Sequence, residues 1–579
     1  MKLAEALKIV KTPGPQDVPP LRVYLACGFQ PAHLELFFAA HLRNRFPGRP
    51  VEVRLGLYGD PTGNLQRIAA EPLDAAAVVL EWSDFDPRLG LRGQCRWSTE
   101  VLADVQSTFL ERADQIVATL KQAGGPPEVA VCLPTLPLLP MSHCPSQRSG
   151  AFDSALRAAA ASLAESLSRL PNVAIVNPGR LDQLSPPAER LDVNSELSCG
   201  LPYSKFHASA VAELLVELLY PAAPKKGLIT DLDDTLWRGI LGEDGVESVS
   251  WDLDHHSRMH GLYQQLLDSL AASGVFLGVA SKNDPRLVAE ALKRSDLLLG
   301  PDKLFPIEAH WGQKSESVAR ILRAWNVGAE SVVFVDDSPM ELDLVKSRFP
   351  QIETVLFPTG DNQGIYGLLG RLRDLFGKAK VEEEDLLRVK SVQNAGTSPA
   401  ELAEPGEHFD SFLQRAEARL TLSYALDPDD SRAFELVNKT NQFNLNGVRY
   451  TRGEWHARLK QPGGFLVVAS YRDKFGPLGK IAVLLGNRQG DDLRLETWVM
   501  SCRAFGRRIE HACLKSLLDR FAAETVTCRF KSTPRNAPLR EFLESILQED
   551  PREGLTIARE QFAACCPPLY QEVQEIENA

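Results

Sequence analysis

The sequence contains no run of 18 consecutive apolar residues, so we expect no transmembrane helix. Its first residues, MKLAEALKIVKTPGPQD, carry charges and proline where a signal peptide needs an apolar core, so we expect no signal peptide either. The ten cysteines form no C-x-x-C pair, which argues against a zinc site or a thioredoxin-like redox motif. Scattered cysteines of this kind are typical of reduced thiols, and we predict a cytoplasmic protein.

An excess of positive charge is also missing, because 64 Lys+Arg stand against 76 Asp+Glu and give a net charge of −12. This balance argues against a general binder of nucleic acid or membrane surfaces, and we predict neither partner. It is still compatible with a local cationic pocket for an anionic substrate. A hydrophobic share of 44% and a length of 579 residues fit a soluble protein of roughly three or four domains.

Short apolar segments alternate with helical ones along the first two thirds of the chain, which predicts the α/β class with parallel sheets. After a tail at 1–20, we predict a first α/β domain at 21–222, with strands at Leu21–Cys27, Val51–Leu57, Ala77–Glu81, Val129–Leu133 and Val173–Val176. We predict a second at 224–378, with strands at Gly227–Thr230, Gly274–Ala280, Ser331–Val335 and Glu353–Leu356. A charged and polar linker at 379–415 then leads to an α+β domain at 416–579, with strands near 464–471, 479–486 and 493–500 and helices near 430–438 and 507–523.

Two carboxylates follow the predicted strand Gly227–Thr230 directly, in the sequence Asp231-Leu232-Asp233. Parallel sheets bind their ligands beyond the carboxyl ends of the strands, which is where these two side chains would lie. One carboxylate can attack a phosphoryl group while the other protonates the leaving oxygen. An isolated D-x-D is more often a polar loop or a helix cap, so the pair needs further support.

That support comes from three later motifs in a consistent order. Ser281 ends the next predicted strand, and its hydroxyl can hydrogen-bond a phosphoryl group. Lys314 can supply a positive charge for phosphate oxygens, and the pair Asp336-Asp337 offers hard oxygen ligands for Mg²⁺. Together with Asp231-Leu232-Asp233, the set is the pattern of a phosphate-handling site.

The four motifs resemble those of the haloacid dehalogenase (HAD) superfamily. The resemblance implies that Asp231 is the nucleophile, that Asp233 is the general acid and base, and that Ser281 and Lys314 hold the phosphoryl group. An aspartate two residues after the nucleophile implies a phosphatase or phosphotransferase. We further assign Thr235 and Asn283 to substrate binding, and Mg²⁺ to Asp231, Asp233, Asp336 and Asp337. The segment Trp237–Trp251 is short and contains several glycines, which predicts a hairpin flap in place of a large lid.

Two segments of the last predicted domain have an unusual composition: NKTNQFN at 438–444 and SCRAFGRRIE at 501–510. With the block DLDDTLWRGILGEDG at 231–245 and TPRNAPLREF at 533–542, they resemble the FkbH-like proteins, a glyceryltransferase/phosphatase family in HAD subfamily IIIC. Asp234, Arg238, His310 and Gln313 differ from the residues usual in that family. These differences spare the catalytic carboxylates and the lysine but leave the substrate open.

The resemblance implies that 1,3-bisphosphoglycerate becomes a dephosphorylated glyceryl thioester on the phosphopantetheine arm of an acyl carrier protein. It also implies a GNAT-like acyltransferase fold for the last domain, with Arg503, Gly506 and Arg507 around the pantetheine arm. We add Asn438 and Asn441 as substrate-binding residues. A basic helix start and a polar turn are the alternative interpretations of these two segments.

The thiol that would carry the acyl group is open between two cysteines. Cys502 lies beside arginines that can lower a thiol pKa, although an inert buried cysteine is equally compatible. Cys27 closes the first predicted strand of a domain that resembles a degenerate SGNH hydrolase. That domain lacks an aspartate to orient His207, so we predict a structural histidine and a non-catalytic domain. A HAD phosphatase coupled to a different acyl transfer, and a carrier-protein scaffold without activity, are the two alternative functions.

Overall fold

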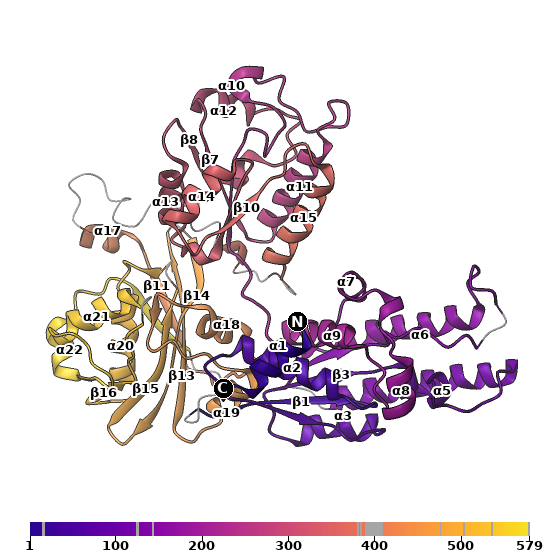
Figure 1. Cartoon of the computed structure of the whole chain (residues 1–579). Helices are drawn as coiled ribbons and strands as arrows, with labels where there is room; N and C mark the ends of the chain where they lie inside the picture. Colours follow the sequence, from indigo (N-terminus) through magenta and orange to yellow (C-terminus); the bar gives the residue numbers. More distant parts are fainter. Residues whose placement is uncertain are drawn as a thin grey trace. The chain divides into compact units, whose positions relative to one another are not determined.

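The computed structural model describes residues 1–13, 18–122, 127–141, 144–378, 381, 385–387, 389, 409–474, 476–501, 504–533 and 536–576. The chain forms two compact units, Met1–Ala222 with Tyr450–Ala457 and Ala223–Arg449 with Arg458–Ala579. Three separate sheets lie in its N-terminal, central and C-terminal parts, which confirms the predicted α/β class (Figure 1). Among the helices of the described ranges, none is long and apolar enough to cross a membrane.

The N-terminal sheet is parallel, with the strand order β2-β1-β3-β4-β5. Its three inner strands, β1, β3 and β4, are mostly apolar because helices cover both faces and bury both sets of side chains. The strands are β1 Leu21–Cys27, β2 Val51–Leu55, β3 Ala75–Val79, β4 Glu128–Cys132 and β5 Val173–Ile175. The helices are α1 Leu3–Lys11, α2 Ala32–Arg45, α3 Pro61–Ala70, α4 Trp82–Phe85, α5 Thr99–Gln122, α6 Ala151–Ser168, α7 Pro178–Leu184, α8 Val193–Cys199 and α9 Lys205–Leu219.

The first residues of the chain differ from the predicted tail at 1–20. They form helix α1, whose Ala6 is fully buried in the core that α2 and α9 share. The guanidinium of Arg43 on α2 donates hydrogen bonds to the carbonyls of Ile9, Val10 and Thr12 at the end of α1. Residues Leu3, Ala6 and Ile9 form the more buried face of this helix, and Glu5, Lys8 and Lys11 are exposed.

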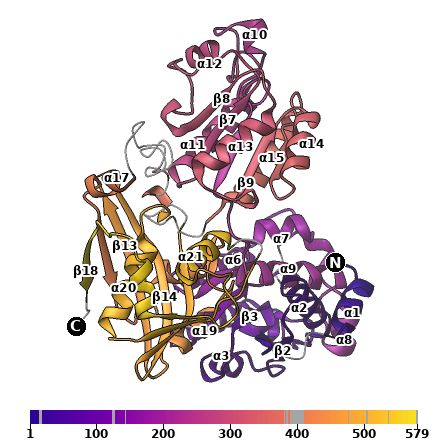
Figure 2. The ribbon, with the colours of Figure 1, turned by 90° about the vertical axis from the view of Figure 1, so that its left-hand side faces the viewer.

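The central sheet is also parallel, with the order β10-β9-β6-β7-β8 and β6 in the middle. Helices α11 and α15 cover one face, and α13 and α14 cover the other (Figures 1 and 2). Its strands are β6 Gly227–Thr230, β7 Phe276–Ser281, β8 Leu304–Ala309, β9 Val332–Asp336 and β10 Glu353–Leu356. Its helices are α10 Leu241–Asp244, α11 Arg258–Ala272, α12 Pro285–Ala291, α13 Lys314–Trp325, α14 Pro339–Arg348 and α15 Asn362–Phe376.

Strand β8 is absent from the sequence-based prediction. Pro306 lies inside it and cannot donate a main-chain hydrogen bond, so the segment does not look like a strand in sequence. The structure accommodates this proline because β8 is the edge strand of the central sheet and pairs with β7 alone. Sequence pattern therefore identified four of the five central strands, and the edge position explains the fifth.

The C-terminal sheet is mixed, with the order β17-β16-β15-β14-β13-β11-β18, and β12 pairs with β15. Most neighbours are antiparallel, but β15 and β16 run parallel and are connected through helix α20. The strands are β11 Arg419–Ser423, β12 Phe443–Asn444, β13 Gly464–Asp473, β14 Gly476–Gln489, β15 Asp492–Met500, β16 Thr525–Cys528, β17 Thr556–Ala558 and β18 Glu572–Ile576. The helices are α17 Phe409–Arg415, which lies inside the predicted linker, α18 Ser431–Lys439, α19 Arg452–Leu459, α20 Ile509–Arg520, α21 Ala537–Leu547 and α22 Arg559–Cys565.

Candidate active site

The carboxyl ends of β6, β7 and β9 bring three predicted site residues to one edge of the central sheet. Asp231 follows β6, while Ser281 and Asp336 are the last residues of β7 and β9. Because β7 and β9 flank β6 in parallel, these ends are neighbours in space. Strands β7 and β8 lie on one side of β6, and the later strands β9 and β10 lie on the other, so the strand order switches direction at β6. A ligand site is expected at such a switch point.

Lys314 bridges two of these carboxylates. Its ammonium nitrogen lies 3.0 Å from Asp231 Oδ2 and 2.7 Å from Asp336 Oδ2, and all three side chains are buried. Burial acts to lower the pKa of Lys314, but the two carboxylates outweigh burial and raise it. Burial and the neighbouring Asp231 raise the pKa of Asp336. The lysine therefore stays charged, and a phosphate oxygen near Asp231 would lie beside a fixed positive charge.

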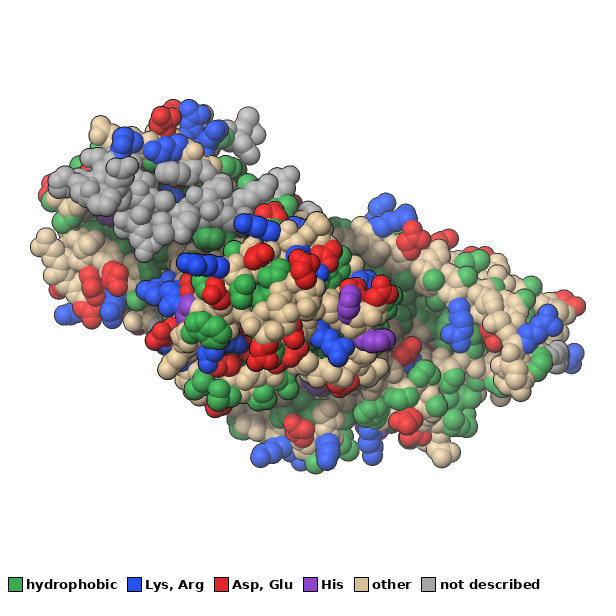
Figure 3. Space-filling view, turned by 90° about the horizontal axis from the view of Figure 1, so that it is seen from above, with side chains coloured by type: hydrophobic (Ala, Val, Ile, Leu, Met, Phe, Trp, Pro, Cys, Tyr) green, Lys and Arg blue, Asp and Glu red, His purple; other side chains and the backbone are tan. Residues whose placement is uncertain are grey.

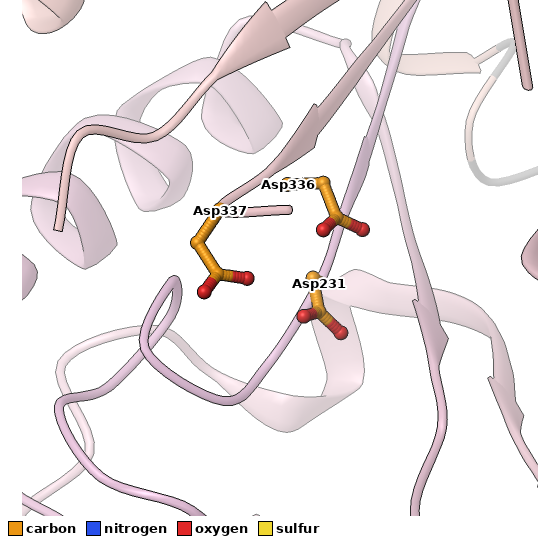
Figure 4. A group of neighbouring side chains, drawn as sticks. All are labelled: Asp231, Asp336 and Asp337. Atoms are coloured by element: carbon orange, nitrogen blue, oxygen red, sulfur yellow. The ribbon is translucent and has the colours of Figure 1, made fainter. Parts of the chain in front are cut away.

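Three carboxylates gather at this edge: Asp231, Asp336 and Asp337 each offer an oxygen, and these oxygens lie within 4.8 Å of one another (Figure 4). Asp231 Oδ1 is buried and accepts no hydrogen bond from the described residues. Three neighbouring carboxylates repel one another unless a cation lies among them, and Lys314 contacts only two of them. The group suits a hard divalent cation such as Mg²⁺, which prefers carboxylate oxygens. The predicted Mg²⁺ cofactor fits this group.

Asp233 lies outside that group, although we had predicted it as a fourth metal ligand. Its Oδ1 accepts hydrogen bonds from Trp237 Nε1 at 3.0 Å and from the Leu241 amide at 3.2 Å. Its Oδ2 accepts one from Asn283 Nδ2 at 2.9 Å. Burial raises the pKa of this carboxyl, although these three hydrogen bonds oppose the shift. The structure places Asp233 as a carboxyl group held two residues after Asp231 by three hydrogen bonds, which suits proton transfer better than metal ligation.

The remaining predicted phosphate contacts are buried near the same edge. The Ser281 hydroxyl lies 3.4 Å from Asn283 Nδ2, and both residues are at most 3% exposed. The Thr235 hydroxyl is buried and has no hydrogen-bond partner among the described residues. Asn283, which we had assigned to substrate binding, uses its amide to hold Asp233 and Ser281.

Helix α11 contributes side chains to this site that the sequence analysis missed. His260 Nδ1 lies 3.0 Å from the carbonyl oxygen of Thr235, and Gln264 Nε2 donates to the carbonyl of Leu236 at 2.9 Å. Tyr263 donates from its hydroxyl to Thr230 Oγ1 at 3.1 Å. These three α11 residues lie on one helical face, so their spacing of three and four residues was the available signal. They hold the loop that carries Asp231 and Asp233.

The segment Trp237–Trp251 forms the predicted flap. Main-chain hydrogen bonds of 2.9 Å and 3.1 Å pair Arg238 with Ser250 in antiparallel geometry, and the short helix α10 lies between them.

Both signs of charge are interspersed on the face of the molecule drawn in Figure 3.

Of the C-terminal residues predicted around a pantetheine arm, Arg507 has another partner. Arg507 Nε lies 3.2 Å from Asp473 Oδ2, its side chain is 9% exposed, and its guanidinium lies over the ring of Tyr471. Arg508 pairs with Asp410. Gly506 has a φ of 72°, which gives the turn before α20 its left-handed bend. Cys502 and Arg503 lie outside the described residues, so their roles stay predictions.

The asparagines of the segment 438–447 act within the C-terminal domain itself. Asn438 donates to the carbonyl of Phe434, and Asn441 accepts a hydrogen bond from Arg449 at 2.6 Å. The amide of Asn446 donates to the carbonyls of Glu496 and Arg529, one beyond the paired part of β15 and one just after β16.

The main chain of the same segment completes this connection. Strands β15 and β16 stop pairing after Leu495 and Cys528. Beyond that point, the Leu445 amide donates to Trp498 at 2.9 Å, and the Leu445 carbonyl accepts from Lys531 at 3.0 Å. The asparagine-rich segment therefore fills the opening between two diverging parallel strands, and this structural role explains its composition.

Cys27 is a poor acyl carrier in this structure. Its thiol is buried and donates to the carbonyl of Phe29 at 3.4 Å. Burial, with a contribution from Asp84, raises the pKa of the thiol to about 12. A thiol with that pKa is almost entirely protonated at neutral pH and is a weak nucleophile. Of the two cysteines proposed from the sequence, only Cys502 stays a candidate.

The structure gives His207 the structural role predicted for it. The imidazole is fully buried, with Nε2 2.8 Å from Thr135 Oγ1 and Nδ1 3.0 Å from Ser185 Oγ. Burial and the nearby Arg190 lower its pKa to about 3, so the ring is neutral at physiological pH. Thr135 in turn donates to Glu81 at 2.6 Å, which extends this buried polar network.

Comparison with known proteins yields solved structures alone. No protein-family model and no curated protein matches the sequence. The chain is similar to the N-terminal part of a Bacteroides fragilis protein that contains a phosphatase domain and was crystallised with Mg, at 19% identity, over 65% of this chain and 99% of that one, with a TM-score of 0.49.

Two further likenesses are much weaker. One is the glycosyltransferase VinC in complex with dTDP, at 12% identity over 65% of this chain and 95% of that one, with a TM-score of 0.13. The other is a GCN5-related glucosamine N-acetyltransferase region of a fungal β-N-acetylglucosaminidase, at 10% identity over 92% of this chain and 64% of that one, with a TM-score of 0.16. Similarities at these identities and TM-scores carry no conclusion about activity.

Proposed function

We propose that this chain is a Mg²⁺-dependent phosphohydrolase of the HAD type that forms an aspartyl phosphate on Asp231. One observation carries the proposal: the buried Asp231 carboxylate is paired with Lys314 through Oδ2, and its Oδ1 accepts no hydrogen bond from the described residues. An oxygen that is held in place but not occupied by a hydrogen bond can act as a nucleophile. Asp233, two residues later, supplies the second carboxyl group that phosphate-ester hydrolysis needs.

The first step transfers the phosphoryl group to the protein. A carboxylate oxygen of Asp231 attacks the phosphorus, and the bond between the phosphorus and the ester oxygen breaks. Asp233 gives its proton to that ester oxygen, so that the product leaves as a neutral alcohol. Lys314 offsets the negative charge on the phosphoryl oxygens, while the Ser281 and Thr235 hydroxyls would donate hydrogen bonds to them.

The second step restores the enzyme. The Asp233 carboxylate accepts a proton from a water molecule, and the oxygen of that water attacks the phosphorus. The bond between the phosphorus and Asp231 then breaks, which releases inorganic phosphate and leaves Asp233 protonated for the next cycle. Asp231, Asp336 and Asp337 would hold the Mg²⁺ ion, which when bound neutralises phosphate charge.

We further propose that the substrate is 1,3-bisphosphoglycerate. A thiol attacks its acyl carbon and releases the acyl phosphate as inorganic phosphate, the Asp231 site hydrolyses the 3-phosphate ester, and the product is a glyceryl thioester on an acyl carrier protein. The support is the sequence resemblance of residues 225–545 to FkbH-like proteins. Cys502 is the proposed thiol, because Cys27 is buried and protonated. The alternative is a phosphatase that serves another acyl transfer. The internal pairing of Arg507 with Asp473 favours the alternative, since it occupies an arginine assigned to the pantetheine arm.

Two measurements test these proposals in order. Phosphate release from a panel of phosphate monoesters, with Mg²⁺ and with EDTA, tests the hydrolase, and Asp231→Asn should abolish release. Wild-type protein without activity on any ester would overturn it. Intact-protein mass spectrometry with 1,3-bisphosphoglycerate and a holo acyl carrier protein then tests the transfer. A glyceryl adduct without phosphate supports it, whereas phosphate release without an adduct favours the alternative.

A further inference from the structure

The flap contacts Asp233, the proposed general acid and base, through one carboxylate oxygen. Asp233 Oδ1 accepts the indole N–H of Trp237 at 3.0 Å and the main-chain N–H of Leu241 at 3.2 Å. Both donors belong to the flap, one at its start and one at the first residue of α10. The orientation of Asp233 therefore depends on where the flap places these two N–H groups.

The other oxygen of the same carboxylate is held from the opposite direction. Asn283, which follows β7, donates from its amide to Asp233 Oδ2 at 2.9 Å. Because donors contact both oxygens, rotation of the Asp233 carboxyl group would break at least one of these hydrogen bonds. Trp237 itself is fully buried in the core of the central domain, so its indole is a rigid donor.

The far end of the flap is held by contacts with Arg294. The guanidinium of Arg294 donates to the carbonyls of Val246 and Val249, each at 2.7 Å. It also lies 4.2 Å from the centre of the Trp251 ring, in cation–π geometry. The flap is thus joined to the body of the domain at Arg294 and to the catalytic carboxyl group at Trp237.

We propose that Trp237 is a positioning residue that orients Asp233 for proton transfer and couples the flap to that carboxyl group. This inference rests on the proposed phosphohydrolase function and adds a residue to it. The proton moves as described above, from the Asp233 carboxyl to the ester oxygen as the phosphorus–oxygen bond breaks. Trp237 takes no part in the bond changes. A misplacement of a catalytic group by about 1 Å can cost on the order of 100-fold in rate, so the N–H of Trp237 affects turnover.

The test compares two tryptophans whose indole N–H groups donate to different acceptors. Trp237→Phe removes the N–H to Asp233 and keeps most of the ring. Trp325→Phe is the matched control, because Trp325 is also buried in the central domain and donates its N–H to the carbonyl of Phe305 at 2.6 Å, away from Asp233. Both variants lose one buried hydrogen bond, so a general loss of stability affects both.

Two substrates separate proton transfer from every other step. Phenyl phosphate needs a proton on its leaving oxygen, whereas the nitro group of p-nitrophenyl phosphate stabilises the departing anion without one. We expect Trp237→Phe to lower kcat/KM for phenyl phosphate by about 10- to 100-fold and for p-nitrophenyl phosphate by less than about threefold. Asp233→Asn should show the same contrast to a larger degree, and Trp325→Phe should show none.

The outcomes distinguish this inference from the proposed function. Equal losses on both substrates in Trp237→Phe, or an identical contrast in Trp325→Phe, would overturn the positioning role while the hydrolase stands. If wild type hydrolyses neither substrate nor any other ester, the proposed function fails first. Should Trp237→Phe not fold, Asn283→Ala removes the donor to the other Asp233 oxygen and should give the same dependence on the leaving group.

Discussion

The ammonium nitrogen of Lys314 lies 3.0 Å from Asp231 Oδ2, and both side chains are only 6% exposed. Asp336 lies 2.7 Å from the same nitrogen. The lysine thus bridges two carboxylates at the ends of neighbouring strands and offsets part of their negative charge. Its replacement should change both turnover and stability.

Lys314→Met should lower kcat for phosphate-ester hydrolysis at least about 100-fold, because it removes the charge that faces the phosphoryl oxygens. It should also lower the melting temperature of the metal-free protein, since breaking a buried ion pair costs about 3–5 kcal/mol. Lys303→Met is the control, because Lys303 pairs with Asp268 at the surface. An unchanged melting temperature in Lys314→Met would contradict the bridging role.

Asp337→Asn should weaken Mg²⁺ activation about tenfold or more, because it removes one of three carboxylates at the proposed ion. The measurement is the Mg²⁺ concentration that gives half-maximal phosphate release. Asp343→Asn removes an equal charge from an exposed position on α14 and should leave this concentration unchanged. Equal shifts in both variants would indicate a general electrostatic effect and no direct ligand.

His207 should make the protein less stable as the pH falls. Its folded-state pKa of about 3 lies below the unfolded value of about 6.5, so the unfolded chain binds the extra proton between these values. Stability is therefore full above about pH 6.5 and falls below it, by at most about 1.4 kcal/mol per pH unit from this residue. Thermal melts from pH 7.5 to 4.5 should show a shallower decline in His207→Gln than in wild type.

His256→Asn is the control for that series, because His256 is exposed and its φ of 55° suits asparagine. It should follow the wild-type curve. A wild-type slope in His207→Gln would show that other groups dominate the acid response.

Arg507→Met should destabilise the C-terminal domain, because it breaks the ion pair between the buried side chains of Arg507 and Asp473, at a cost of about 3–5 kcal/mol. The double variant Arg507→Met, Asp473→Asn should be more stable than the sum of the two single effects implies. A double-mutant cycle on melting temperatures measures this difference. Strictly additive effects would show that the pair contributes no coupling.

Alkylation of thiols should separate the cysteines by burial. At neutral pH, iodoacetamide should label the exposed Cys199 and leave Cys27 unmodified, because burial holds Cys27 in the protonated form. Peptide mass spectrometry of the native protein measures both, and labelling in denaturant confirms that Cys27 is detectable. Rapid native labelling of Cys27 would restore it as a candidate acyl carrier.

The elements that sequence pattern predicted well are the buried parallel strands. A strand such as Val332–Asp336 is covered on both faces, so its first four residues are all apolar and it is easy to recognise. Strand β8 was missed because an edge strand tolerates Pro306. Helix α1 was missed because it is short, with nine residues and an apolar face of only two turns.

The nature of the candidate site, by contrast, follows from the sequence alone. Asp231, Ser281, Lys314 and Asp336 occur in an order that places each after a strand or at a helix start, and parallel strands bring such ends together. That geometric rule requires no knowledge of side-chain contacts. It was sufficient to predict a phosphate and metal site at one edge of the sheet.

Only the tertiary structure decided which side chains pair with one another and which are buried. It pairs Arg507 with Asp473, buries the Cys27 thiol, and turns the Asp233 carboxyl group toward Trp237. Arg507 and Asp473 are 34 residues apart in the sequence, and Asp233 and Trp237 are 4 residues apart. No local propensity specifies either pair. Sequence determined the chemistry available at the strand ends, whereas packing determined the partners, because most buried polar groups must pair with a nearby one.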